Sequence, residues 1–119
     1  MRSITFCEDA RALFALAERI ADVLAQKRPE LGQNDRRTEA HLRASIADAR
    51  YARTVYAAMC RDKEKSAVAR RFLEQADHRR RRALERLREH VIRSLAVICE
   101  LMNHDALVDV AEHVLSTGA

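Results

Sequence analysis

The chain has 119 residues, of which 48 % are hydrophobic and 34 % are charged, and its formal net charge is +4. This length predicts one domain over 1–119, and the composition argues against a disordered chain. The apolar runs are far shorter than the ~20 residues of a membrane-spanning helix, so we expect no membrane partner. Because the N-terminus lacks the charged and then apolar pattern of a secretion signal, we expect a cytoplasmic location.

Residues 33–117 contain neither glycine nor proline, the residues that interrupt regular structure most strongly. A stretch of this length that is rich in alanine, leucine, arginine and glutamate predicts an all-α fold. The apolar spacing and the capping residues predict an antiparallel helical bundle of about four helices, at 6–27, 35–61, 64–102 and 105–116.

The first two predicted helices each have an apolar stripe. A capping box at Thr5 and Glu8 begins the first, Pro29 and Gly32 end it, and Asn34 or Asp35 is expected to cap the second. The residues expected to be buried are Phe6, Ala10, Leu13, Phe14, Ala17, Ile20, Ala21 and Leu24 in the first helix, and Leu42, Ile46, Ala49, Val55 or Tyr56, and Met59 in the second.

The predicted helix 64–102 is the longest, with Asp62 or Ser66 as its candidate cap. Its second half has a seam of apolar residues spaced alternately three and four apart: Leu84, Leu87, Val91, Leu95, Ile98 and Met102. Arg79 and Arg80 interrupt the stripe, which predicts a kink or a solvated gap near 77–82. Because the fourth predicted helix is much shorter, part of the third has no internal partner, and we expect a homodimer.

The distribution of charge is the strongest functional indication. Residues 63–93 have eleven basic and five acidic side chains, whereas residues 94–119 have four acidic side chains and no basic ones. Guanidinium groups bind phosphate and carboxylate oxygens bidentately, and a cluster of them attracts polyanions. The predicted binding residues are Arg79, Arg80, Arg81, Arg82 and Arg86 in the third helix, and Arg43, Arg50 and Arg53 in the second.

Two other interpretations of the arginines stay open. The chain has nineteen arginines and three lysines, as GC-rich coding favours, and many arginines have acidic neighbours one helical turn away, as in a solvated, ion-paired face. Alternatively, the acidic C-terminal region folds over the basic stretch, either within one chain or from a second subunit. No aromatic residues alternate with the basic run, which argues against recognition by base stacking.

Cysteines and histidines give no sign of a cofactor. Cys7, Cys60 and Cys99 are widely spaced and lie beside apolar residues, so we expect small buried side chains. The five histidines form no Glu-x-x-His motif of the kind that helical bundles use for di-iron sites, so no metal is expected. Without a nucleophile constellation or a glycine-rich loop, we expect a non-enzymatic interaction or regulatory module that self-associates and binds an acidic protein or a nucleic-acid backbone.

The segment His90-Val91-Ile92-Arg93-Ser94-Leu95-Ala96 is similar to the phosphoacceptor segment of histidine-phosphotransfer domains. Those small four-helix bundles have an aliphatic residue two positions after the histidine and a basic residue three positions after it. Ser94 stands where the family has a glycine. The resemblance implies an alternative function, a signalling module in which His90 accepts a phosphoryl group.

Overall fold

The computed structural model describes residues 10–61 and 66–101. These residues form the helices α1 (Ala10–Gln26), α2 (Gln33–Arg61) and α3 (Ala67–Leu101), with a short 3₁₀ helix, η1 (Arg28–Glu30), between α1 and α2. The all-α class is therefore confirmed. The predicted helix 105–116 and the predicted start of the first helix lie outside the described residues.

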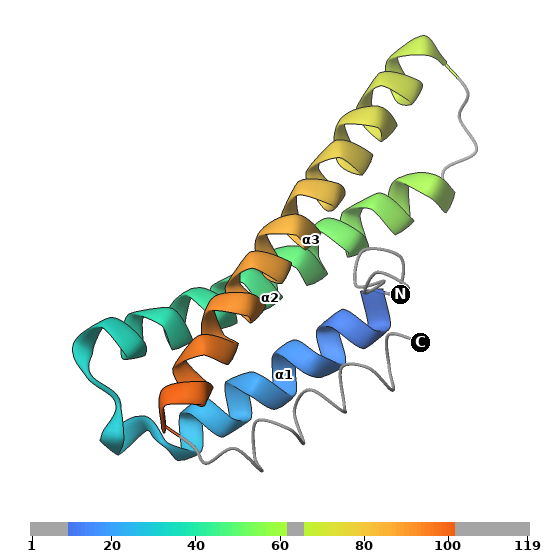
Figure 1. Ribbon diagram of the computed structural model, residues 1–119. Helices are drawn as coiled ribbons and strands as arrows, with labels where there is room; N and C mark the ends of the chain where they lie inside the picture. Colours follow the sequence, from blue (N-terminus) through green and yellow to red (C-terminus); the bar gives the residue numbers. More distant parts are fainter. Residues whose placement is uncertain (1–9, 62–65, 102–119) are drawn as a thin grey trace, which may run out of the picture.

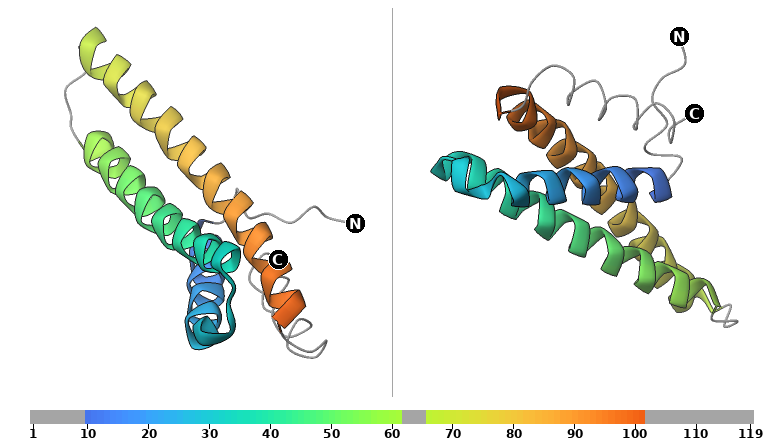
Figure 2. Two further views of the ribbon diagram at one scale, coloured as in Figure 1. Left: turned by 90° about the vertical axis from the view of Figure 1, so that its left-hand side faces the viewer. Right: turned by 90° about the horizontal axis from the view of Figure 1, so that it is seen from below.

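The two long helices α2 and α3 run in opposite directions and form a hairpin (Figure 1). Helix α1 lies across the half of the hairpin that is farther from its tip, as the views in Figure 2 also show. The extents are 55 × 35 × 17 Å. A 35-residue helix is ~52 Å long, so α3 alone accounts for the longest dimension. Among the described helices, none has both the length and the apolar content needed to cross a bilayer.

The core lies where the three helices meet. Its largest fully buried apolar side chains are Leu13, Leu16, Ile20, Leu24, Leu42, Leu87, Val91 and Ile98. Toward the tip of the hairpin the core cluster ends at Ala52 of α2 and Ala83 of α3. Beyond these positions, Ala76 is the only buried residue of the described chain. The tip is therefore two helices thick and has almost no core of its own.

Most of the burial predicted for the first two helices is confirmed. The buried residues are Leu13, Phe14, Ala17, Ile20, Ala21, Leu24, Leu42, Ile46 and Ala49, whereas Ala10, Val55, Tyr56 and Met59 are half-buried. Phe6 lies outside the described residues.

The predicted N-terminal cap is wrong for α2 and confirmed for α3. Helix α2 begins at Gln33, so the prediction of Asn34 or Asp35 as its cap was wrong, because both residues are already inside the helix. The amide of Arg36 donates to the carbonyl of Gly32 at 3.0 Å and continues the helical pattern back to that residue. Ser66 is confirmed as the cap of α3, since its Oγ accepts a hydrogen bond from the amide of Ala69 at 3.1 Å.

The apolar seam of α3 is confirmed at Leu84, Leu87, Val91 and Ile98. Leu95 is only half-buried, and Ser94 takes its place in the core with none of its surface exposed. The spacing from Val91 to Ser94 to Ile98 is three and then four residues, as a seam requires. Met102 lies outside the described residues.

Helix α3 continues without a break through 77–82, so the predicted kink is absent. Arg80 fills the interruption in the apolar stripe, because its guanidinium carbon lies 4.7 Å from the centroid of the Tyr56 ring on α2. Its Nη2 also donates to Oδ1 of Asp77 at 2.6 Å. An arginine can pack its aliphatic stem and stack its planar head, and in this way it replaces an apolar residue between two helices.

The expected burial of the cysteines was wrong for the two that the structure describes. Cys60 and Cys99 are exposed free thiols. Cys60 is the penultimate residue of α2, beyond the end of the described core cluster. Cys99 follows buried Ile98, and the advance of ~100° per residue turns it away from the core. Cys7 lies outside the described residues.

Candidate functional site

The arginines of α3 separate onto different sides of the helix. Residues at spacings of three, four and seven share one side of a helix. Arg79, Arg82, Arg86 and Arg93 have these spacings and form one row. The row covers about 21 Å along the helix axis, since each residue advances ~1.5 Å.

Two adjoining surface hollows lie along this row between α2 and α3. One, of about 300 Å³, is lined by Asp48, His78, Arg79, Arg82, Ala83 and Arg86. The other, of about 390 Å³, is lined by His41, Ala44, Ser45, Asp48, Arg86, His90 and Arg93. We call this surface, with its row of four arginines, the basic face.

Most of the positive charge on the basic face has no counter-charge. Arg79, Arg82 and Arg93 make no hydrogen bond or ion pair in the described part of the chain. Nη1 of Arg86 lies 4.0 Å from Oδ2 of Asp48, at the outer limit of an ion pair, and both side chains are more than half exposed. Such a pair is worth little in water. Of these four guanidinium groups, only that of Arg86 has an ion pair in the described chain, and that pair is long.

Arg80 and Arg81 belong to the same run of the sequence, but their side chains are not part of the basic face. Both contact Asp77, Arg80 Nη2 at 2.6 Å and Arg81 Nη2 at 3.1 Å. The hydrogen bond from Arg80 is the main reason that the pKa of Asp77 is lowered, against the opposing effect of its partial burial. Of the five arginines predicted on this helix, the structure brings together Arg79, Arg82 and Arg86 and separates the other two.

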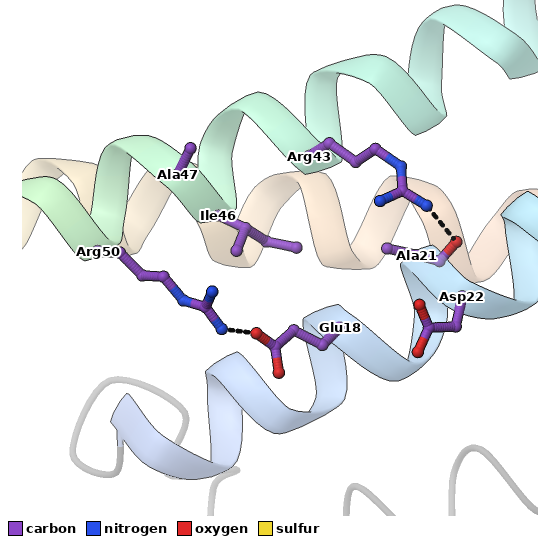
Figure 3. A pocket seen from close by; sticks show the side chains of 7 residues that line it. All are labelled: Glu18, Ala21, Asp22, Arg43, Ile46, Ala47 and Arg50. Carbon is purple, nitrogen blue, oxygen red and sulfur yellow. Dashed lines mark hydrogen bonds and ion pairs between the residues drawn. The ribbon is translucent and has the colours of Figure 1, made fainter.

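Two of the three arginines predicted on α2, Arg43 and Arg50, lie toward α1 (Figure 3). The third, Arg53, also faces α1, because its guanidinium group lies over the ring of Phe14. Arg50 forms an ion pair with Glu18 of α1. Nη2 of Arg43 donates to the carbonyl oxygen of Ala21 at 3.3 Å. A hollow of about 410 Å³ between these helices is lined by Glu18, Ala21, Asp22, Arg43, Ile46, Ala47 and Arg50. Here two carboxylates accompany two guanidinium groups.

Phe14 extends the contacts between α1 and α2. The guanidinium carbons of Arg50 and Arg53 lie 5.6 and 5.3 Å from the centroid of its ring, within the range of cation–π attraction. We call the surface formed by Phe14, Glu18, Asp22, Arg43, Arg50 and Arg53 the paired face. Its arginines are engaged within the molecule, and their binding of a polyanion stays a prediction.

Glu39 is a structural residue that the sequence did not single out. Its side chain is buried, with 4 % of the residue exposed, and it binds two arginines. Arg28 donates to both of its oxygens, at 3.0 and 2.5 Å, and Arg43 donates to Oε2 at 3.0 Å. The hydrogen bond from Arg28 is the largest cause of a lowered pKa at Glu39; burial opposes it, and Arg43 adds to it. The spacing of Glu39 and Arg43 is visible in the sequence, whereas the contact with Arg28 requires the turn at η1.

Two histidines from different helices meet in the second hollow of the basic face. The ring centroids of His41 on α2 and His90 on α3 are 5.6 Å apart, with an angle of 55° between the rings. The pKa of His90 is lowered, first by burial and then by the nearby charges of Arg93 and His41. The pairing of these histidines depends on the register of two antiparallel helices, which the sequence does not show.

In the described ranges, no three His, Cys, Asp or Glu side chains lie close enough together to hold a metal ion. Comparisons with protein-family models, with curated proteins and with solved structures give no match for this chain. The function is therefore argued from the geometry and the charge of the residues described above.

Proposed function

We propose that this protein is a non-enzymatic helical interaction module whose basic face binds an anionic partner, either a nucleic-acid backbone or an acidic protein surface. The observation that carries the proposal is the difference in pairing between the two faces. Arg43 and Arg50 each contact an anion or a carbonyl oxygen within the chain, whereas Arg79, Arg82 and Arg93 have no such contact.

Exposed, unpaired arginines destabilise the protein little, because water solvates their charges. They can form new hydrogen bonds when a polyanion binds. Each guanidinium group on the basic face can form charge-assisted, bidentate hydrogen bonds with a phosphate or a carboxylate. Displacement of counterions from a nucleic acid adds a favourable term that weakens as salt is raised. A row on one continuous helix suits an extended partner, because the four arginines follow one another along the same side of α3.

The test is the binding of labelled duplex and single-stranded oligonucleotides across a range of salt concentrations. The variant R79Q/R82Q/R93Q is expected to lose at least about tenfold in affinity, and the slope of log K against log salt is expected to decrease by ~2–3. The matched control R11Q/R19Q/R70Q removes the same charge from exposed positions outside the basic face and should have a much smaller effect.

Three outcomes of this titration decide between the alternatives. Equal losses in the two triple variants would contradict the basic face as the site, because only net charge would then matter. If oligonucleotides fail to bind at low salt, poly-glutamate replaces them as the probe for an acidic protein surface. Failure of both probes to bind would reject the proposal and leave the arginines as solvated side chains.

A second candidate function is phosphoryl transfer at His90, as the resemblance to histidine-phosphotransfer domains implies. The observation in its favour is the position of His90 in a hollow that Arg86 and Arg93 also line. Its lowered pKa favours the neutral imidazole, which is the nucleophilic form. Acetyl phosphate should then transfer one phosphoryl group to the native protein and to His41→Gln, but not to His90→Gln. Unmodified native protein would reject this candidate.

We further propose that the tip of the hairpin mediates self-association as a homodimer. Val68 and Phe72 are 61 % and 55 % exposed, and their spacing of four places them on one side of α3. Phe72→Glu should shift a dimer to monomer in sedimentation velocity at micromolar concentration. Ile92→Glu is the control, because Ile92 is similarly exposed, at 57 %, and lies away from the tip. A native protein that sediments only as a monomer would contradict this proposal.

A further inference from the structure

We propose that the hollow between His41 and His90 is a binding site for a single tetrahedral oxyanion, with a phosphomonoester group as its ligand. The inference deepens the proposed function and rests on it in one respect, since the ligand would be the terminal phosphate of a nucleic acid held on the basic face. It narrows the location to one hollow of the basic face and adds a dependence on pH.

The hollow gathers hydrogen-bond donors from two helices. Helix α2 contributes His41 and Ser45, and α3 contributes Arg86, His90 and Arg93. Arg86 lies four residues before His90 and Arg93 lies three residues after it, so one guanidinium group lies on each side of the imidazole along α3. Planar guanidinium groups match the oxygens of phosphate bidentately, and imidazolium groups and hydroxyls can donate to the remaining oxygens.

The hydrogen bonds inside the protein do not explain why a histidine occupies position 90. Its Nδ1 is buried and has no hydrogen-bond partner in the described chain. The Oγ of Ser94, one turn further along α3, is also buried and unpartnered. Buried polar atoms are nearly always satisfied, and each exception calls for an explanation, such as a water molecule, an ion or a functional role. The anion site is therefore inferred from the residues that line the hollow.

The charges around His90 connect anion binding to proton uptake. Arg86 and Arg93 on α3 and His41 on α2 oppose its protonation, whereas Glu89 on α3 favours it, and Asp48 of α2 also lines the hollow. Burial adds to the lowering of the pKa. A bound dianion would reverse this balance, because a negative charge within a few ångströms stabilises the imidazolium form. Binding should therefore raise the pKa of His90.

The sign of this linkage predicts how affinity depends on pH. Protonated His90 binds an anion more strongly than neutral His90 does. The affinity for an anion that stays divalent therefore rises as the pH is lowered through the pKa of His90. A phosphomonoester becomes monovalent below its second pKa of ~6. Sulfate is therefore expected to bind more tightly throughout a titration from pH 8 to pH 5, whereas phenyl phosphate is expected to bind best near pH 6.

The experiment follows the histidine ring signals by NMR while sulfate or phenyl phosphate is added to the full chain. The signals of His41 and His90 should move saturably, and the pKa of His90 should rise on binding. His78 is the internal reference, because it lines the other hollow. His41→Gln changes an exposed residue and should weaken binding at pH 6 by at least about fivefold; R11Q/R19Q, which changes two exposed arginines of α1, should leave binding of these small anions unchanged.

The outcomes separate this site from the proposed function. Equal, unsaturable shifts at His78 and His90 would overturn the site, because they would report only general attraction to a basic surface. Unchanged affinity in both His41→Gln and His90→Gln would overturn it as well. The proposed function is tested separately, with oligonucleotides at pH 8. If they still bind the two histidine variants but not R79Q/R82Q/R93Q, the proposed function stands even where the anion site fails.

Discussion

The two faces of the hairpin formed by α2 and α3 expose arginines to different surroundings, although the residue type is the same. On the paired face, Arg43 and Arg50 reach across to α1 and contact a carbonyl oxygen and a carboxylate. On the basic face, the arginines of α3 form one ion pair in the described chain, between Arg86 and Asp48 at 4.0 Å. The comparison teaches that the side of a helix on which an arginine lies decides whether it holds the fold together or is available to a partner.

The cause of the difference is the placement of α1. This helix provides Glu18, Asp22 and Phe14 to the paired face, and it packs on one side of the hairpin only. The basic face receives no residue from α1 and keeps its excess of positive charge. Three predictions test this distinction, and they are given in order of decreasing effect.

The largest loss of stability is expected when the buried carboxylate of Glu39, which binds two arginines, is removed. Glu39→Ala removes the acceptor of both Arg28 and Arg43 and leaves a small cavity at the turn between α1 and α2. We expect the free energy of unfolding to fall by about 2–3 kcal/mol, as for other charge-assisted hydrogen bonds to a buried group. Denaturation by urea measures the change. Glu85→Ala, at an exposed position of α3, is the control and should be close to neutral.

A smaller effect should appear in the dependence of stability on pH. The folded-state pKa of Glu39 is lowered, so its contribution is present above the unfolded value of ~4.3 and is lost as pH falls through the folded value. Native protein should therefore lose more stability between pH 5 and pH 3 than Glu39→Gln. The folded-state pKa of His90 is also lowered, so a separate loss should begin as pH falls below ~6.5 and should be absent in His90→Gln. Identical pH profiles for these variants and the native protein would contradict the assignment.

The smallest effects on stability are expected for two double variants, one on each face. R50Q/R53Q removes an exposed ion pair and two cation–π contacts with Phe14, and should cost about 1 kcal/mol. R79Q/R82Q removes two unpaired charges and should change the free energy of unfolding by less than about 0.5 kcal/mol. Thermal unfolding of the two double variants side by side measures the difference. A larger loss in R79Q/R82Q would mean that the basic face is part of the fold.

The candidate site was only partly predictable from the sequence. The run from Arg79 to Arg82 is visible as composition, and its division follows from helical periodicity once α3 is known to be continuous. The contact of Arg80 with Tyr56 depends on the register between α2 and α3, and so does the meeting of His41 with His90. Periodicity gives the side of one helix on which a residue lies, but it does not give the residue opposite.

The sequence by itself determined the helices of this protein. The long stretch without glycine or proline, together with the apolar spacing, was enough to predict the all-α class and most of the buried positions, because these depend on local propensity and on periodicity. Only the tertiary structure decided which arginines have partners. An ion pair needs a carboxylate from another turn or another helix, and α1 brings Glu18 to Arg50 while nothing in the described chain is brought to Arg79 or Arg82.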